Sequence, residues 1–293
     1  MYTIEDFSFG FELELSNVPK NFPLPAHLGK WEYCEADIIN TRGEYANISA
    51  DPLGINPPVG GEINTIPSKT IEDQVHRIMT IIDLFKKNGH DPDVGITSHS
   101  HIHVHVKGLE QDIDALKRLV NYVYINQEFT FMNVYRYMGS KIPESGYSKI
   151  KNYLKNDGAR KMPKWLADNV IHLANNFDDV LTLFARGIDG VTKIRPVRYG
   201  INLYSLKNCR TIEFRCFRGS TKLEELYDCF FFVQEFMLQA LNGGYNVDEI
   251  IDNCDTWKFP PMHFNKAQAE GWINTKHHVQ LVNGKNRKYW EAD

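Results

Sequence analysis

The sequence has few of the features that mark secreted, membrane-spanning or nucleic-acid-binding proteins. Its five cysteines are scattered and form no C-x-x-C pair, so neither a disulfide framework nor a thiolate zinc site is indicated. No stretch approaches the run of about 18 apolar residues that a membrane span needs, and the first residues lack the basic and apolar segments of a secretory signal. The formal charge of −4, without a polybasic block, does not favour nucleic-acid binding. We therefore expect a cytoplasmic protein without membrane or nucleic-acid partners.

The common glycine-rich phosphate loops are also absent. Neither G-x-x-x-x-G-K-[ST] nor G-x-G-x-x-G occurs, which excludes the two familiar phosphate cradles at a helix N-terminus. With 293 residues, of which 42% are hydrophobic, the chain has enough apolar side chains to bury a large core. We expect a single domain over residues 1–293, with a lid-like excursion over 16–60 and a C-terminal strap over 245–293.

One segment is unusually rich in histidine. Between residues 98 and 107 every second position is an imidazole, namely His99, His101, His103 and His105. In an extended strand alternate side chains share a face, so all four rings project from one side. Each imidazole that is buried needs hydrogen-bond partners, so such a row has no use in an apolar core. The pattern indicates a strand that lines a cavity holding a metal, a phosphate or both.

Four other predicted strands combine an apolar face with a polar one. They lie at residues 7–15, 60–66, 197–205 and 210–217, and helices are predicted over 70–88, 110–127, 163–177 and 221–243. Taken singly, each polar face also fits a solvated surface or a surface ion pair. Together they predict an antiparallel sheet whose concave face carries the following residues: Glu12, Glu14, Glu62, His103, His105, Arg198, Glu213 and Arg215.

The chemistry of this set favours a divalent cation beside a phosphate. Glu12 and Glu14 lie two residues apart, and paired carboxylates repel unless a cation lies between them. Sets rich in carboxylates favour Mg²⁺ or Mn²⁺ over zinc, and arginines supply planar donors for phosphate oxygens. The sequence therefore predicts phosphoryl-transfer chemistry on a magnesium nucleotide.

Five short segments carry motifs in a distinctive order. They are F-G-F-E-L-E at 9–14, G-E-I at 61–63 with T-I-P at 65–67, H-I-H-V-H-V at 101–106, R-Y-G-I-N-L at 198–203 and T-I-E-F-R-C-F-R-G-S at 211–220. This order resembles the amidoligase family of ATP-dependent carboxylate–amine ligases, within the glutamine synthetase and γ-glutamylcysteine ligase superfamily. The resemblance implies an α+β fold, in which a curved antiparallel β-sheet forms a funnel with helices packed on its outer side. It also implies ATP- and Mg²⁺-dependent formation of an amide or isopeptide bond through an acyl phosphate.

The resemblance also implies roles for individual residues. The metal ligands would be Glu12, Glu14, Glu62, His103 and Glu213. Arg215 and Arg198 would be catalytic and, with His105 and Asn202, would bind the nucleotide. Trp31 and Asp37 resemble a W…D element of the family, which would bring Asp37 to the substrate or nucleotide, although the stretch 38–59 is expanded relative to the family pattern. The pattern does not require His99 or His101, which we expect to be bystanders.

Three other interpretations remain open at this point. One is a guanidino phosphotransferase on the same fold, which would stop at phosphoryl transfer. Another is a zinc metallohydrolase built on the H-x-H strand, which would need no nucleotide. The third is a degenerate family member that only binds ligands, against which the intact glutamates, histidines and E-x-R pair argue. The ligase interpretation implies small-molecule or peptide carboxylates and amines as substrates, whose identity the sequence does not indicate.

Overall fold

A computed structural model describes residues 1–19, 21–33, 59–94, 99–139, 160–186, 197–244, 250, 253 and 254. The chain divides into a compact unit, Met1–Lys258, and a second unit, Phe259–Asp293. The second unit lies outside the described residues, as do residues 34–58 with Asp37 and nearly all of the predicted strap. The single-domain arrangement therefore stays a prediction.

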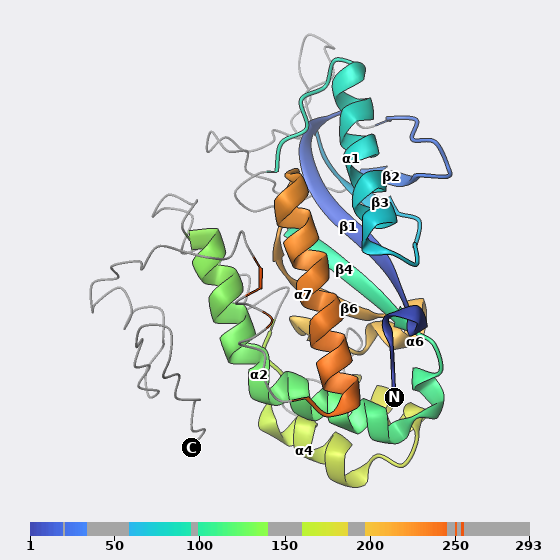
Figure 1. Cartoon of the computed structure of the whole chain (residues 1–293), viewed down its shortest axis with the longest axis vertical. Helices are drawn as coiled ribbons and strands as arrows, with labels where there is room; N and C mark the ends of the chain where they lie inside the picture. Colours follow the sequence, from blue (N-terminus) through green and yellow to red (C-terminus); the bar gives the residue numbers. More distant parts are fainter. Residues whose placement is uncertain are drawn as a thin grey trace, which may run out of the picture. The chain divides into compact units, whose positions relative to one another are not determined.

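The first unit is built on one antiparallel sheet of six strands in the order β2-β3-β1-β4-β6-β5 (Figure 1). This sheet and the helices described below confirm the α+β class, whereas the funnel-shaped fold of glutamine synthetase stays a prediction. The strands are β1 (Phe7–Val18), β2 (Gly29–Tyr33), β3 (Val59–Thr65), β4 (His99–Val106), β5 (Ile201–Asn202) and β6 (Ile212–Arg218).

The helices differ in how well the sequence predicted them. The first begins after Thr70, whose hydroxyl accepts a hydrogen bond from the N–H of Asp73, and ends at Gly89 in the left-handed conformation, as predicted.

No helix among the described residues has the length and apolar character needed to cross a bilayer. The helices are α1 (Ile71–Lys87), α2 (Ile113–Gly139), α4 (Lys164–Leu173), α5 (Phe177–Phe184), α6 (Ser205–Cys209) and α7 (Leu223–Asn242), with 3₁₀ turns η1 (Ile4–Asp6) and η2 (Leu109–Gln111).

Helices α1 and α7 cover one face of the sheet (Figure 1). On β1 the burial of side chains alternates, and the phenylalanines of the buried set reach α7: Phe9 and Phe11 both pack on the ring of Phe230. From β6, Phe214 packs edge-on against Phe236 of the same helix. Because neighbouring side chains on a strand point to opposite faces, the glutamates of β1 project away from the helices.

The predicted excursion over 16–60 is ordered at its start. Strand β2 begins at Gly29 and adds an edge to the sheet beside β3. The Trp31 ring crosses Gly61, where any Cβ would lie 2.3 Å from the ring, and its Nε1 donates to the carbonyl of Pro19 at 3.0 Å. Glycine at this position is therefore required by the close approach of the ring.

Two predicted elements are shorter than expected, because polar side chains cap the backbone. The predicted strand 197–205 is reduced to two residues, since Asn202 accepts a hydrogen bond from the N–H of Tyr204 and the chain turns into α6. The predicted helix 163–177 ends at Leu173, and the side chain of Asn176 caps a separate helix, α5.

Two predicted helix starts are also wrong. The helix expected from 110 begins at Ile113, where the Asp112 carboxylate accepts from the N–H of Ala115, and it continues to Gly139. The helix expected from 221 begins at Leu223, and its N-cap residue, Lys222, makes no side-chain cap.

Strand β6 carries one extra residue relative to β4. Ser100 lies opposite Phe217, but Ile102 lies opposite Phe214, so two residues of β6 face His101. This is the register change of a β-bulge. As a result Phe217 packs on Phe232 of α7, with ring centroids 6.2 Å apart, whereas regular alternation along β6 would place it on the face of Glu213.

Candidate metal centre

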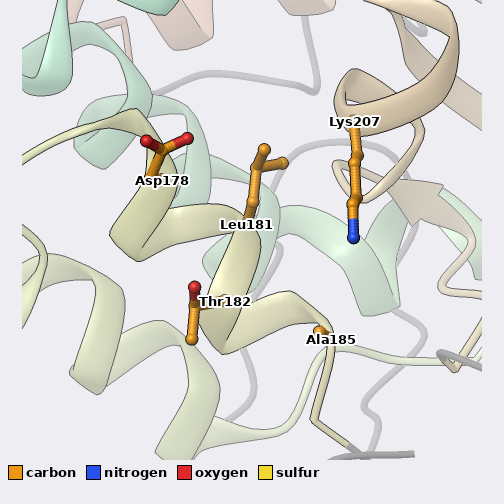
Figure 2. Close-up of a pocket in the computed structure, with 5 residues that line it drawn as sticks. All are labelled: Asp178, Leu181, Thr182, Ala185 and Lys207. Atoms are coloured by element: carbon orange, nitrogen blue, oxygen red, sulfur yellow. The ribbon is translucent and has the colours of Figure 1, made fainter. Parts of the chain in front are cut away.

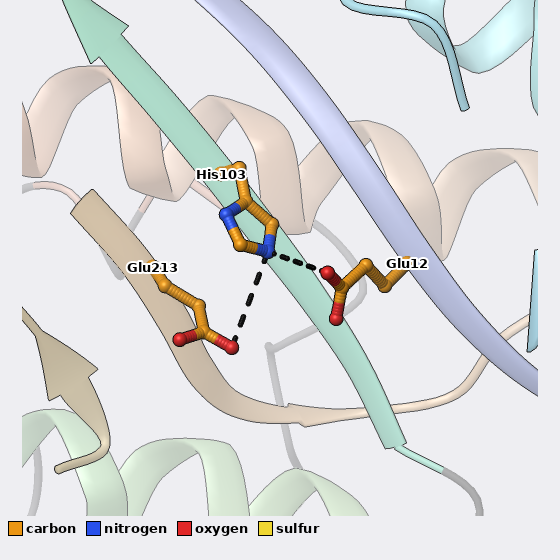
Figure 3. Close-up of side chains that lie close together, drawn as sticks. All are labelled: Glu12, His103 and Glu213. Carbon is orange, nitrogen blue, oxygen red and sulfur yellow. Dashed lines mark ion pairs between the residues drawn. The ribbon is translucent and has the colours of Figure 1, made fainter. Parts of the chain in front are cut away.

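Three adjacent strands bring two carboxylates and one imidazole together on the face away from the helices. Figure 3 shows Glu12 of β1, His103 of β4 and Glu213 of β6, which each offer one ligand atom within 4.8 Å of the others. The Nε2 atom of His103 lies 2.9 Å from Oε1 of Glu12 and 4.0 Å from Oε1 of Glu213. The three residues were all predicted as metal ligands, and the structure places them in one cluster.

The imidazole of His103 is held in the manner of a metal ligand. Its Nδ1 atom lies 2.9 Å from the hydroxyl of Thr211, which in turn lies 3.3 Å from the hydroxyl of Ser205. Its Nε2 atom faces the two carboxylates but is off line for a hydrogen bond, and it has no hydrogen-bond partner among the described residues. Metal-binding histidines are typically fixed through one ring nitrogen, which leaves the other for the ion.

The two carboxylates of the cluster are held in the same way. Oε2 of Glu12 lies 2.8 Å from Nδ1 of His101, and Oε2 of Glu213 accepts a hydrogen bond from Nδ2 of Asn202 at 2.8 Å. His101 is buried and contacts a cluster member, so it is not a rim or solvent-facing residue. The signal that identifies it is the strand register, which puts His101 directly opposite Glu12.

Arg215 joins the cluster from β6, as the E-x-R motif predicted. Its guanidinium forms an ion pair with Oε1 of Glu213, and both side chains are buried. The N–H of Arg215 donates to the carbonyl of Gly200 at 2.7 Å, which continues the pairing of β5 with β6. A buried arginine beside a cation site supplies positive charge in a medium of low dielectric, where an anionic group would be bound strongly.

The electrostatics keep the carboxylates of the cluster ionised. Burial alone would raise the pKa of Glu12, but contacts with His101 and His103 outweigh it and lower that pKa. Burial opposes ionisation of Glu213 as well, and Arg215 with the two histidines lowers its pKa. Burial would lower the pKa of His103, but Glu12 and Glu213 raise it. Positive charge is thus favoured at the point where a cation would lie.

A row of carboxylates continues from the cluster across β1, β3 and β2. Glu14 lies directly opposite Glu62, which lies opposite Glu32. Burial, followed by the charges of Glu12 and Glu14, raises the pKa of Glu62 to about 7. The N–H of His99 donates to Glu14 at 2.9 Å, and its Nδ1 lies 3.5 Å from the same oxygen, so His99 is buried against the carboxylate row and does not face solvent.

The remaining predicted residues lie in different settings. Glu14 and Glu62 share the face of the cluster but lie outside its three-atom triangle. His105 is half-buried and lies opposite Ser8. The side chain of Arg198 is exposed, and the backbone carbonyl of Arg198 accepts a hydrogen bond from the N–H of Arg160. The roles assigned to these four residues stay predictions.

A separate surface pocket lies between α5 and α6 (Figure 2). It shares no residue with the cluster, and its lysine donates to the hydroxyl of Tyr204 at 3.2 Å. The pocket is therefore not part of the candidate metal centre. Its lining residues are Asp178, Leu181, Thr182, Ala185 and Lys207.

Comparisons with known proteins do not assign a family. No protein-family model matches the chain, and no curated protein matches it. Among solved structures, a bifunctional glutathione synthetase from Pasteurella multocida is similar with a TM-score of 0.35 and 11% sequence identity, over 86% of this chain. The chain spans 40% of the length of that protein. A likeness at this level does not assign an activity, so the family resemblance rests on the motifs.

Proposed function

We propose that the chain is an ATP- and Mg²⁺- or Mn²⁺-dependent ligase that joins a carboxylate to an amine. The observation that carries this proposal is the convergence of Glu12, His103 and Glu213 around an imidazole nitrogen that faces both carboxylates. The order of the motifs supplies the reaction class, and the site supplies the chemistry that such a reaction needs.

The donor atoms fit a hard or borderline divalent cation. Two carboxylates and one imidazole suit Mg²⁺ or Mn²⁺, whereas structural zinc sites take more nitrogen and sulfur. The Nδ1 atom of His101 is engaged with Glu12, which leaves one imidazole facing the cluster centre and disfavours the zinc hydrolase. When bound, the cation would neutralise the negative charge of polyphosphate oxygens.

Around the cation, this chain's own residues would bind and orient the reactants. Glu14 and Glu62 would extend the ligand set along the carboxylate row. Arg215 would hold the transferred phosphoryl group from its buried position, and Arg198, an exposed residue that precedes β5, would contact the phosphates or the activated carboxylate. His105 and Asn202 would line the nucleotide site, and Asp37 would contact the substrate or nucleotide.

The cation site is tested first, by titrating the protein with Mn²⁺ and following the free ion by electron paramagnetic resonance. We expect one site or more in the wild type and at least a hundredfold loss of affinity in Glu213→Gln. The matched control is Glu32→Gln, the same change on the same face at the exposed edge strand, which should bind as the wild type does. Equal binding by Glu213→Gln and the wild type would exclude the site.

The reaction is tested with Mg-ATP and pooled carboxylates and amines. A ligase releases ADP when both pools are present and yields products whose mass equals the two reactants minus water. ADP release with a guanidino compound alone, giving a phosphorylated product, would support the phosphotransferase instead. Cleavage of substrates without nucleotide would support the hydrolase, and cation binding without turnover would support the binding module.

A further inference from the structure

The side chain of His101 makes a specific contact with one oxygen of Glu12, in addition to its effect on the charge of the cluster. It is 4% exposed and lies opposite Glu12 in the register of β1 and β4. Its Nδ1 atom is 2.8 Å from Oε2 of Glu12. An ionised carboxylate can only accept hydrogen bonds, so Nδ1 of His101 carries the proton and donates it.

This contact divides the two oxygens of Glu12 between two tasks. Oε2 is bound to His101, whereas Oε1 lies 2.9 Å from Nε2 of His103 and faces the cluster centre. In His103, Nδ1 is bound to Thr211 and Nε2 faces the centre. In Glu213, Oε2 is bound to Asn202, and Oε1 faces the centre while it also pairs with Arg215. Each cluster member therefore offers the cation one atom and has its second atom fixed by a neighbour.

We propose that His101 is a positioning residue that makes Glu12 a single-oxygen ligand, and that it thereby selects Mg²⁺ or Mn²⁺ over Ca²⁺. The inference rests on the proposed cation site and goes beyond it, because it assigns the choice of cation to a residue outside the ligand set.

The physical reason lies in the coordination that each ion accepts. Mg²⁺ demands nearly octahedral geometry with one oxygen from each carboxylate, and Ca²⁺ takes six to eight oxygens and often both from one carboxylate. If the bond from His101 is removed, the Glu12 carboxylate can turn and offer both oxygens to one ion. Ca²⁺ would gain a second oxygen ligand when the carboxylate turns, whereas Mg²⁺ would lose a ligand oxygen that was held in a fixed position.

The structure identifies the substitution that preserves the bond. The amide nitrogen of asparagine falls close to the position of Nδ1 in histidine, whereas that of glutamine falls close to Nε2. His101→Asn therefore keeps the donor to Glu12, and His101→Gln and His101→Ala do not. His76→Ala, on the exposed side of α1, is the control for loss of a histidine elsewhere.

The experiment measures Mn²⁺ affinity by electron paramagnetic resonance and its displacement by Mg²⁺ and Ca²⁺ in the full chain, with thermal unfolding recorded for each variant. We expect His101→Ala and His101→Gln to bind Mn²⁺ about ten- to a hundredfold more weakly and to shift the Mg²⁺/Ca²⁺ preference toward Ca²⁺. His101→Asn should remain within a few-fold of the wild type on both measures, and His76→Ala should match it.

The outcomes separate the two proposals. A wild type that binds no Mn²⁺ would overturn the cation site and this inference with it. A wild type that binds Mn²⁺, together with a folded His101→Ala of unchanged affinity and preference, would overturn only the role of His101. Equal losses in the asparagine and glutamine variants would also overturn that role, because a merely structural need for the ring does not distinguish its two nitrogens.

Discussion

On the face of the sheet that α1 and α7 cover, β1 contributes Phe7, Phe9 and Phe11, whereas on the opposite face the same strand contributes Glu12 and Glu14. The first set is packed in aromatic contacts and is fully buried. The second set is half-buried and depends on imidazoles for compensation. The difference shows that stability comes from the helix-covered face, and that the other face holds charge which folding alone would not favour.

The largest loss of stability is expected for a substitution on the apolar face. Phe230→Ala removes the ring on which Phe9 and Phe11 pack, and should lower the free energy of unfolding by about 3 to 5 kcal/mol. Urea unfolding followed by circular dichroism measures it. Leu173→Ala, at an exposed position, should change stability by less than about 0.5 kcal/mol. A loss below about 1 kcal/mol for Phe230→Ala would show that this face is not the source of stability.

On the polar face, Arg215→Met should destabilise the cation-free protein by about 3 kcal/mol, because it leaves the buried carboxylate of Glu213 without its ion pair. Arg215 lowers the pKa of Glu213, so this contribution is present at neutral pH and is lost as pH falls through the folded-state value. Saturating Mn²⁺ should restore part of the loss, since the ion neutralises the same carboxylate. Unfolding curves at pH 7 with and without Mn²⁺ test this, and equal curves in the variant would contradict it.

Glu62→Gln tests the difference between the two faces in the opposite direction, because this substitution on the polar face should stabilise the protein. The folded-state pKa of Glu62 is raised to about 7, so its ionisation works against folding as pH rises from the unfolded value near 4.5. At about 1.4 kcal/mol for each pKa unit, the variant should be roughly 2 to 3 kcal/mol more stable than the wild type at pH 8. The gain should vanish near pH 4, where both are neutral. A gain independent of pH would mean that packing, and not charge, is responsible.

The smallest expected effect tests whether the two faces are independent. Thr70→Ala removes the cap of α1 and should cost about 1 kcal/mol of stability. Because α1 lies on the helix-covered face, the affinity for Mn²⁺ should stay as in the wild type. A parallel loss of cation binding would show that the helix layer also sets the geometry of the cluster.

The sequence predicted the direction of side chains better than their partners. Alternation along β1, β4 and β6 placed Glu12, His103 and Glu213 on one face, because a strand has a side-chain period of two. Which residues meet across strands depends on register, which a single strand does not encode. Register puts Glu12 opposite His101 and puts His103 opposite Gly10, so the contact between His101 and Glu12 was not predictable from the H-x-H spacing.

Local polar contacts account for the elements that the sequence did not predict. Asn202 turns the chain into α6, and Asn176 separates α4 from α5, in each case through one side-chain hydrogen bond. The hydrophobic periodicity continues through both asparagines, so a prediction based on periodicity makes the strand at 197–205 and the helix at 163–177 too long. The free energy of such a turn differs from that of a continued helix or strand by about one hydrogen bond. Sequence patterns do not resolve a difference of this size.

The extra residue on β6 limits how this site could be moved into another protein. On a strand of regular alternation, Glu213, Arg215 and Phe217 would all point to the polar face. The irregular register lets the strand present the first two to the cluster and still return Phe217 to α7. A designer who grafted only the side chains onto an ideal sheet would expose a phenylalanine or lose the arginine. The unit to be transferred is therefore the backbone of β1, β4 and β6, including the extra residue on β6.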